Sequence, residues 1–144
     1  MIVQSTHNAT DVRKNWGQFN DDVVRKGPQF VQRNRDEWAA LSKEQLHAAF
    51  NSFYFNANLF HEDDGSITLS IRDLGIIANG ETEEEALAEL AEFLIDYAEE
   101  YQEEFELYYR SPNRRDHFPF IMNVLIQDDI EGVKSLVKCQ HGEK

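Results

Sequence analysis

The chain has 144 residues and a formal net charge of −13, with 41% hydrophobic and 12% aromatic residues. This composition excludes disorder along the whole length and suits one domain or two small ones. No run of about 18 apolar residues occurs, and the start lacks the apolar stretch of an export signal, which argues against a membrane protein. We therefore expect a soluble cytoplasmic protein, in which the single Cys139 excludes an internal disulfide.

Charge is distributed unevenly along the chain. Residues 1–50 hold 7 Lys and Arg against 6 Asp and Glu, for a net charge of +1, whereas residues 51–144 hold 7 against 21, for a net charge of −14. An acidic protein can still bind a polyanion if its cations gather on one face and its acidic part points away. The two parts of the chain therefore predict two different surfaces.

The first third predicts a helix, a hairpin and a second helix, after a short strand at Ile2–Gln4. Apolar residues recur on one face of the first helix, at Val12, Trp16, Phe19 and Val23. Asn8 or Thr10 can cap this helix, and Gly27–Pro28 ends it. Strands at Phe30–Val31 and Trp38–Leu41 flank a turn at Asn34–Arg35, and the capping box Ser42–Gln45 opens a helix that reaches about Phe50.

Most cations of this segment fall in three pairs, namely Arg13 and Lys14, Arg25 and Lys26, and Arg33 and Arg35. These cations can be interpreted either as ordinary solvated charges or as parts of a phosphate-binding surface. The arrangement favours phosphate, because Arg13 and Lys14 fall in the first turns of the predicted helix, where free N–H groups attract anions. Arg33 and Arg35 flank the hairpin turn, which packs back near that helix. A module of 50 residues offers few contacts, so specific DNA binding would require a dimer on adjacent half-sites.

The next segment predicts a three-stranded β-meander. Apolar residues alternate over Phe53–Leu59 and Ile67–Ile71, around a hairpin turn at Glu62–Gly65, and Gly75–Gly80 forms a shorter extended piece. The capping box Thr82–Glu85 then opens a helix over residues 82–109, in which apolar residues recur at spacings of three and four from Leu87 to Tyr108.

This helix is longer than a three-stranded sheet can cover. Some of the apolar surface of Tyr101, Phe105 and Tyr108 must therefore be covered either by the closing helices or by another chain. Those closing helices are predicted at Phe118–Gln127 and Ile130–Val137, with a loose tail after Cys139.

Catalytic and metal-binding patterns are absent from the sequence. It has no Gly-rich phosphate loop, no GxSxG and no HExxH. If Gly65 is placed at the sixth position of a calcium loop, Phe60 and Ile71 fall where oxygen ligands are required. Cys139 and His141 are too few for a zinc site. We therefore expect no catalytic residue, cofactor or metal, and a protein that is not an enzyme.

Residues 9–46 resemble the N-terminal domain of Phd/YefM antitoxins. The matching pieces are Ala9–Trp16, the basic turn Val23–Pro28 and the helix start Leu41–Glu44. The resemblance implies a dimer that binds operator DNA, with Arg13 and Arg33 at the family's DNA-contacting positions. Lys14 and Arg35 are added from the charge pattern. In this chain Asp36 and Glu37 follow the turn, where they would repel phosphate.

Residues 60–98 resemble a HicB-type antitoxin domain. The matching pieces are Phe60–Gly65, Arg72–Gly75 and Asn79–Leu87, with Arg72 where the family pattern has proline. The resemblance implies a β-β-β-α module that contacts a toxin and has no catalytic role.

Together these features predict an α+β fold with a Phd/YefM-like module at residues 1–50, a HicB-like meander and long helix at 51–110, and a helical segment with a loose tail at 111–144. The predicted function is that of a type II toxin–antitoxin antitoxin. It would neutralise a cognate toxin, plausibly a RelE-like ribonuclease, and repress its own operon as a homodimer or higher oligomer bound to operator DNA. The alternative is an acidic dimeric adaptor that uses the Phd-like fold without binding DNA.

Overall fold

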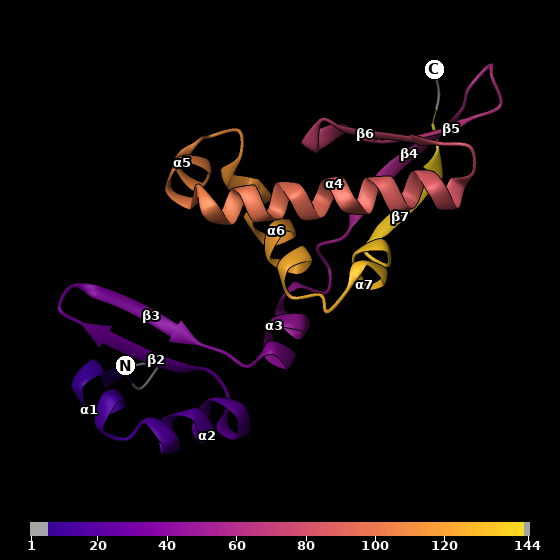
Figure 1. Ribbon diagram of the computed structural model, residues 1–144. Helices are drawn as coiled ribbons and strands as arrows, with labels where there is room; N and C mark the ends of the chain where they lie inside the picture. The colour runs from indigo at the N-terminus through magenta and orange to yellow at the C-terminus, as the bar shows by residue number, and fades with distance from the viewer. Residues whose placement is uncertain (1–5, 143–144) are drawn as a thin grey trace. The chain divides into compact units, whose positions relative to one another are not determined.

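The computed structural model describes residues 6–142 and has a mixed α+β fold with two sheets. The chain divides into two compact units, Met1–Ala49 and Phe50–Lys144, each with its own cluster of buried hydrophobic residues (Figure 1). The strand expected at Ile2–Gln4 lies outside the described residues.

The first unit is built on a small mixed sheet. Its described elements are β1 (Thr6–Asn8), α1 (Ala9–Lys14), α2 (Trp16–Lys26), β2 (Gln29–Arg33), β3 (Asp36–Ala40) and α3 (Lys43–Phe50), of which α3 ends at the first residue of the second unit. Strand β2 lies in the centre, parallel to β1 and antiparallel to β3. The predicted hairpin and the Ser42–Gln45 capping box are both present, since the Gln45 backbone N–H donates to the Ser42 hydroxyl at 3.1 Å.

The single first helix expected from the apolar spacing is wrong, because the helix breaks at Asn15. This residue has φ −118° and ψ 42°, and its side-chain amide donates to the carbonyl oxygen of Asp11 at 3.1 Å. A short polar side chain that bonds its own backbone competes with helix continuation. As a result, Arg13 and Lys14 lie in the last turn of a six-residue helix and not in the first turns of a longer one.

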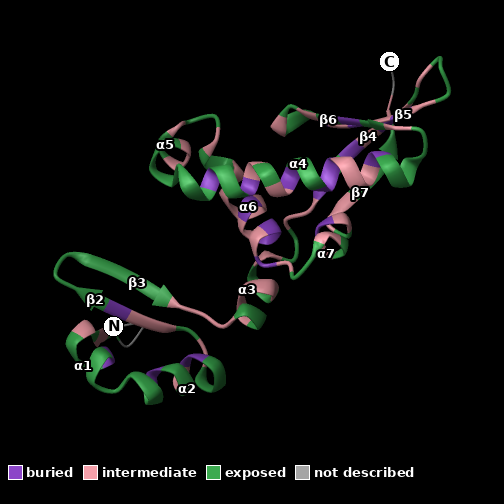
Figure 2. Ribbon diagram, viewed as in Figure 1, coloured by how far each residue is buried: buried purple, intermediate pink, exposed green. Residues whose placement is uncertain are grey.

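The core of the first unit is small. Only Val12, Phe19, Val23 and Val31 form its buried cluster among the described residues, and Figure 2 shows most of this unit as exposed. Trp16, on the same predicted stripe, is 59% exposed. The unit therefore keeps large apolar side chains on its surface.

The second unit is built on a four-stranded sheet with the order β6-β5-β4-β7. Its described elements are β4 (Phe55–His61), β5 (Ile67–Ile71), η1 (Arg72–Leu74), β6 (Ile76–Gly80), α4 (Glu83–Glu103), α5 (Phe105–Arg110), η2 (Arg115–His117), α6 (Phe118–Leu125), α7 (Ile130–Lys134) and β7 (Val137–His141). The predicted meander forms β4, β5 and β6, and the predicted capping box opens α4, because the Thr82 hydroxyl accepts from the Glu85 N–H at 3.1 Å.

The fourth strand corrects the expectation for the end of the chain. Helix α7 ends at Lys134 and not at Val137, and Val137–His141 form β7, parallel to β4, so Gln140 and His141 of the loose tail expected after Cys139 belong to a strand. The Gly142 N–H continues this pairing by donating to the Leu59 carbonyl at 2.8 Å. Polar groups along the edge of β4 need partners, and Val137–His141 supplies them despite lacking an apolar alternation.

The helix expected over residues 82–109 also breaks, at Glu104, where φ is −110° and ψ is 42°. The break separates α5 from α4, and the segment from α5 to α6 then covers the far end of α4. Tyr101 is only 1% exposed and donates its hydroxyl to the Arg114 carbonyl at 2.8 Å, while Phe105 contacts Phe118 at a ring distance of 5.7 Å. The closing segment therefore supplies much of the cover that Tyr101 and Phe105 required.

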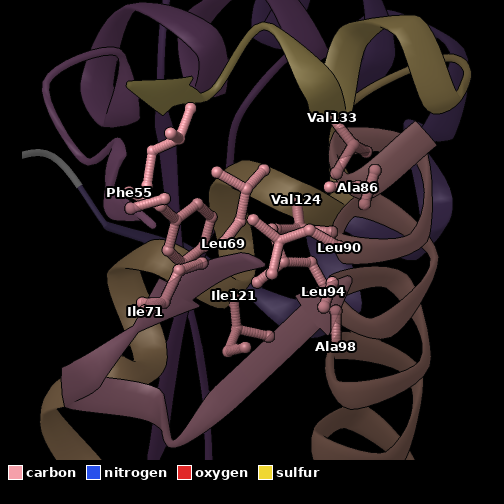
Figure 3. Close-up of a cluster of buried hydrophobic side chains, with 14 of the residues drawn as sticks. Phe55, Leu69, Ile71, Ala86, Leu90, Leu94, Ala98, Ile121, Val124 and Val133 are labelled. Atoms are coloured by element: carbon pink, nitrogen blue, oxygen red, sulfur yellow. The ribbon is translucent and has the colours of Figure 1, made fainter. Parts of the chain in front are cut away.

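The core of the second unit lies between one face of the sheet and helices α4 and α6. Figure 3 shows Phe55, Leu69 and Ile71 from the sheet packed beside Leu90 and Leu94 of α4. The alternate residues of β4 and β5 have lower burial, so the other face of the sheet is the polar one.

Candidate functional site

The four predicted cations lie at one end of the first unit. The parallel pairing of β1 with β2 places Asn8 beside Gln32, so that α1 begins at the same end of the sheet as the β2–β3 turn (Figure 1). Arg33 is the last residue of β2, and Arg35 occupies the turn beside Asn34, whose φ of 56° permits the tight reversal. Arg13 and Lys14 end α1. We call Arg13, Lys14, Arg33 and Arg35 the basic end.

Ion pairing separates the basic end from the remaining cations of this segment. Arg25 pairs with Asp21 at 2.9 Å and Lys26 with Asp22 at 3.4 Å, both one turn apart on α2. Hydrogen bonding from Gln18, together with Lys26, lowers the pKa of Asp22 below its usual value. The four residues of the basic end are exposed, and none of them forms a recorded ion pair within residues 6–142. Their charges are therefore available to an external anion.

The start of α2 adds backbone donors beside these cations. Helix α2 begins at Trp16, directly after Lys14 and Asn15, and has no acidic residue in its first turn. The Asn15 side chain makes no capping bond there, and its amide nitrogen donates to the Asp11 carbonyl in the preceding turn. The helix N-terminus near Arg13 and Lys14 is thus that of α2, where unsatisfied N–H groups favour an anion.

Carboxylates also lie near the basic end. In the β2–β3 register Arg33 is opposite Asp36, and Gln32 is opposite Glu37. Side chains of directly opposite residues lie on the same face of a sheet, so Asp36 reduces the positive potential at Arg33.

Exposed aromatic side chains lie on the same unit. Trp16 stacks on Phe19 at a ring distance of 5.9 Å, and Trp38 meets the edge of Phe19 at 6.4 Å. Trp38 is 46% exposed and belongs to edge strand β3. Two exposed tryptophans around one buried phenylalanine form an apolar surface of the kind found at protein interfaces.

The second unit carries an acidic surface along α4. Its exposed carboxylates are Glu83, Glu84, Glu85, Glu92, Asp96, Glu99, Glu100 and Glu103, and Phe93 lies exposed among them. The excess of acidic residues in this part of the chain is visible in the sequence. Helical periodicity places these carboxylates away from the buried stripe that contains Leu90 and Leu94.

A pocket in the second unit was not predicted. It has a volume of about 280 Å³ and is lined by Ser52, Tyr54, Phe55, Asn56, Ile71, Asp73, Leu74, His117 and Phe120. The lining comes from three separated segments, and no single motif in the sequence marks it. The only signal was the Arg72–Gly75 piece, which contributes Asp73 and Leu74 to the pocket wall.

His117 at this pocket is held by hydrogen bonds. Its Nδ1 lies 2.8 Å from the Tyr97 hydroxyl, and the ring also bonds the backbone of Asp73. Burial, with a further contribution from nearby Arg114, lowers the pKa of His117 below 6.5. Burial likewise raises the pKa of Tyr97 above 10. The histidine is therefore neutral at pH 7, and the pocket has a single charged lining residue, Asp73.

Two further classes of site were tested over residues 6–142. No group of three or more His, Cys, Asp or Glu side chains in this range is placed to hold a metal ion. In the same range, no helix combines the length and the apolar character needed to cross a bilayer.

Comparisons with known proteins identify the family. No curated protein matches the sequence at a significant level. A crystal structure from Syntrophomonas wolfei subsp. wolfei, described as an antitoxin part of a proposed toxin/antitoxin system, is 35% identical and aligns with a TM-score of 0.90 over 96% of this chain and 100% of its own. The model of the PHD-like family, described as "Antitoxin of toxin-antitoxin, RelE / RelB, TA system", matches residues 1–139. The chain therefore belongs to the PHD-like family of toxin–antitoxin system antitoxins.

Proposed function

We propose that this antitoxin divides two binding activities between its two units. The first unit binds operator DNA as a homodimer or higher oligomer and represses transcription of its own operon. The second unit holds the cognate toxin that membership of the family implies. Both activities belong in the cytoplasm, where operon and toxin are found, and neither requires a catalytic step by this chain.

The observation that carries the DNA-binding proposal is the unpaired state of the basic end. Arg13 and Lys14 come directly before the N-terminus of α2 and Arg33 and Arg35 lie at the β2–β3 turn, all four exposed, whereas Arg25 and Lys26 on the same unit are engaged by Asp21 and Asp22. DNA affinity depends on cations that can replace the counterions of phosphate, and cations already paired with carboxylates contribute less.

An exposed apolar surface suited to dimerisation supports the same proposal. One basic end supplies only four cations, so specific operator binding requires two copies on adjacent half-sites. The exposed Trp16 and Trp38 provide an apolar surface on the same unit through which two copies can associate.

The toxin-binding proposal rests on charge. Residues 51–144 have a net charge of −14, and much of this charge lies on the exposed face of α4. A toxin that binds or cleaves RNA needs a basic surface, so a RelE-like ribonuclease is the partner proposed. Complementary charge accelerates association and selects against acidic partners.

The proposed architecture joins a Phd/YefM-like unit to a HicB-like unit. The β-β-β-α order of β4, β5, β6 and α4 agrees with the HicB resemblance of residues 60–98. The order α1, α2, hairpin and α3 agrees with the Phd/YefM resemblance of residues 9–46.

The test of DNA binding compares two arginines on one unit. Arg13→Ala removes an unpaired cation, whereas the matched control Arg25→Ala removes one that is paired with Asp21. In gel-shift titrations on the DNA upstream of the operon, Arg13→Ala should weaken binding about tenfold and reduce the salt dependence by about one counterion. Equal affinity for both variants, or a larger loss for Arg25→Ala, would remove the basic end as the DNA-binding site.

The adaptor without DNA binding remains the second candidate, and the register supports it. Asp36 lies opposite Arg33, and Glu37 follows it on strand β3. Both carboxylates lower the positive potential at the hairpin. A dimer in solution that binds no upstream DNA at low salt would establish this alternative.

A further inference from the structure

The pocket of the second unit lies where three segments meet. Ser52–Asn56 leads into and begins β4, Ile71–Leu74 leaves β5 through η1, and His117–Phe120 opens α6. All three belong to the second unit, which also carries the acidic surface of α4.

The pocket wall has two chemically different parts. Phe55, Ile71, Leu74 and Phe120 form an apolar part. The remaining lining residues, Ser52, Tyr54, Asn56, Asp73 and His117, supply hydroxyl, amide, carboxylate and imidazole groups. A ligand that fits both parts has an apolar stem and a polar or charged end.

The charge of that end follows from Asp73. This residue is exposed on η1, and within residues 6–142 no recorded ion pair or side-chain hydrogen bond engages its carboxylate. Burial disfavours the charged form of His117, and no Lys or Arg lines the pocket to offset the negative charge of Asp73. The ring of Tyr54, another lining residue, is already covered by the Lys138 ammonium, whose Nζ lies 3.6 Å from the ring centre, so the ring is not counted as a site for a second cation. Among the lining residues, Asp73 therefore favours a cation over an anion, and this preference acts against the positive charge of nearby Arg114.

Size restricts the ligand further. The volume of about 280 Å³ falls just below the range of roughly 300–1,000 Å³ typical of pockets for drug-sized molecules. It has room for one long side chain but not for a helix or a strand. Arginine matches best, because its stem can cover the apolar part while its planar group donates several hydrogen bonds to the acceptors of Asp73, Asn56 and Ser52.

We propose that this pocket receives an arginine side chain of the cognate toxin and anchors the toxin on the second unit. The proposal rests on the toxin binding proposed above and adds its anchoring contact. The carboxylates of α4 lie on a convex helix surface and attract a basic partner at long range, whereas the pocket fixes the position of one residue of that partner.

The pocket can be tested without the toxin. N-acetyl-arginine amide is titrated at millimolar concentrations into the full chain labelled with ¹⁵N, and shifts are followed at Asn56, Asp73 and His117. Saturable shifts are expected with this probe and not with N-acetyl-norleucine amide, which has a stem but no charge. Asp73→Asn should abolish the shifts, whereas the matched control Asp63→Asn, in the exposed β4–β5 turn, should retain them. Shifts of equal size with both probes, or in Asp73→Asn, would overturn the proposal.

A second variant separates the shape of the pocket from its charge. Ser52→Trp fills the mouth and leaves Asp73 in place, and it should also abolish the shifts with the arginine probe. The amide spectrum of each variant shows that the unit has folded before the probe is added. Unchanged binding by folded Ser52→Trp would place the arginine probe outside the pocket and overturn the proposal.

Binding to the toxin from the same operon distinguishes the two proposals. If the unmodified chain binds the toxin and Asp73→Asn binds it at least tenfold more weakly than Asp63→Asn, the anchoring contact is supported. If all three bind equally, the toxin-binding role stands and the arginine pocket is wrong. If the unmodified chain does not bind the toxin, the proposed function itself fails, together with the anchoring contact that rests on it.

Discussion

The hydroxyl of Tyr97 lies 2.8 Å from Nδ1 of His117, which joins α4 to the η2 turn at the pocket of the second unit. Protonation of the imidazole requires Nδ1 to become a donor, so the Tyr97 hydroxyl would have to reorient and accept. Burial already disfavours the charged ring, and Arg114 adds to this effect against the opposing influence of Asp73 and Asp116.

His117 should therefore make stability depend on pH. Its pKa in the folded protein is below the ordinary value of 6.5, so the unfolded chain binds the proton more readily. The contribution of neutral His117 to the free energy of unfolding is fully present above pH 6.5. It is lost as the pH falls from 6.5 through the lower pKa of His117 in the folded protein. In urea unfolding between pH 7.5 and 5, His117→Gln should show a shallower decline than the unmodified chain. The control Gln102→Ala, at an exposed residue without a titratable group, should keep the original slope, and equal slopes for both variants would exclude His117 as the source.

Asp36 should limit DNA affinity. Because it lies opposite Arg33 in the β2–β3 register, Asp36→Asn removes a negative charge beside a predicted phosphate contact. Operator affinity measured by fluorescence anisotropy should rise about two- to tenfold at low salt, with a smaller gain at high salt. Asp63→Asn makes the same chemical change in the second unit and should leave the affinity unchanged. Unchanged affinity on Asp36→Asn would show that the hairpin does not face DNA, and a fall would contradict the repulsion assigned to Asp36.

Trp38 should contribute to self-association. Its side chain is 46% exposed beside the buried Phe19, and truncation of a tryptophan at the centre of an interface commonly costs about 2 kcal/mol or more. In sedimentation velocity, Trp38→Ala should shift the dimer toward monomer. Ile77→Ala removes a side chain that is 62% exposed in the second unit, and it should leave the distribution unchanged. A monomeric unmodified chain would contradict the proposed dimer directly.

Asn123 should be important for the stability of the second unit. It is 1% exposed in α6, and its side-chain amide donates to the Phe53 carbonyl at 2.8 Å, while Gln127 donates to its oxygen at 3.3 Å. Asn123→Ala leaves the buried carbonyl without this partner, so the free energy of unfolding should fall by about 1–3 kcal/mol. The exposed Gln102→Ala should change it by less than about 0.5 kcal/mol, as measured by chemical denaturation.

Helices and strands could be predicted from the sequence where their formation depends on residues close together in the chain. The Thr82–Glu85 capping box and the alternation in Ile67–Ile71 each depend on neighbouring residues, and both form the expected structure. The break at Asn15 does not follow from the apolar pattern, because Val12, Trp16 and Phe19 keep helical spacing across it, and this pattern is insensitive to the bond from the Asn15 side chain to the Asp11 carbonyl.

Features that depend on distant segments could not be predicted in this way. Strand β7 spans the end of the helix expected at Ile130–Val137 and the start of the tail expected after Cys139, and only pairing with β4 makes it a strand. The pocket needs β4, η1 and α6 to meet, so no local pattern reveals that Asp73 and His117 share its wall. The residues of the basic end could be predicted because charge is visible in the sequence. The sequence alone does not show that Arg25 is paired with Asp21 whereas Arg13 is unpaired, and this difference required the structure.

The parallel pairing of β4 with β7 has a consequence for synthesis. Gln140 bonds Asn58 across 82 residues of chain, so the second sheet stays incomplete on the ribosome until its last strand has emerged. The strands β1, β2 and β3, in contrast, are all present once residue 40 has emerged. Nascent chains arrested after residue 110 should therefore contain a protease-resistant first unit and a protease-sensitive second one. During each round of translation, the half proposed to bind operator DNA would fold before the half proposed to bind the toxin.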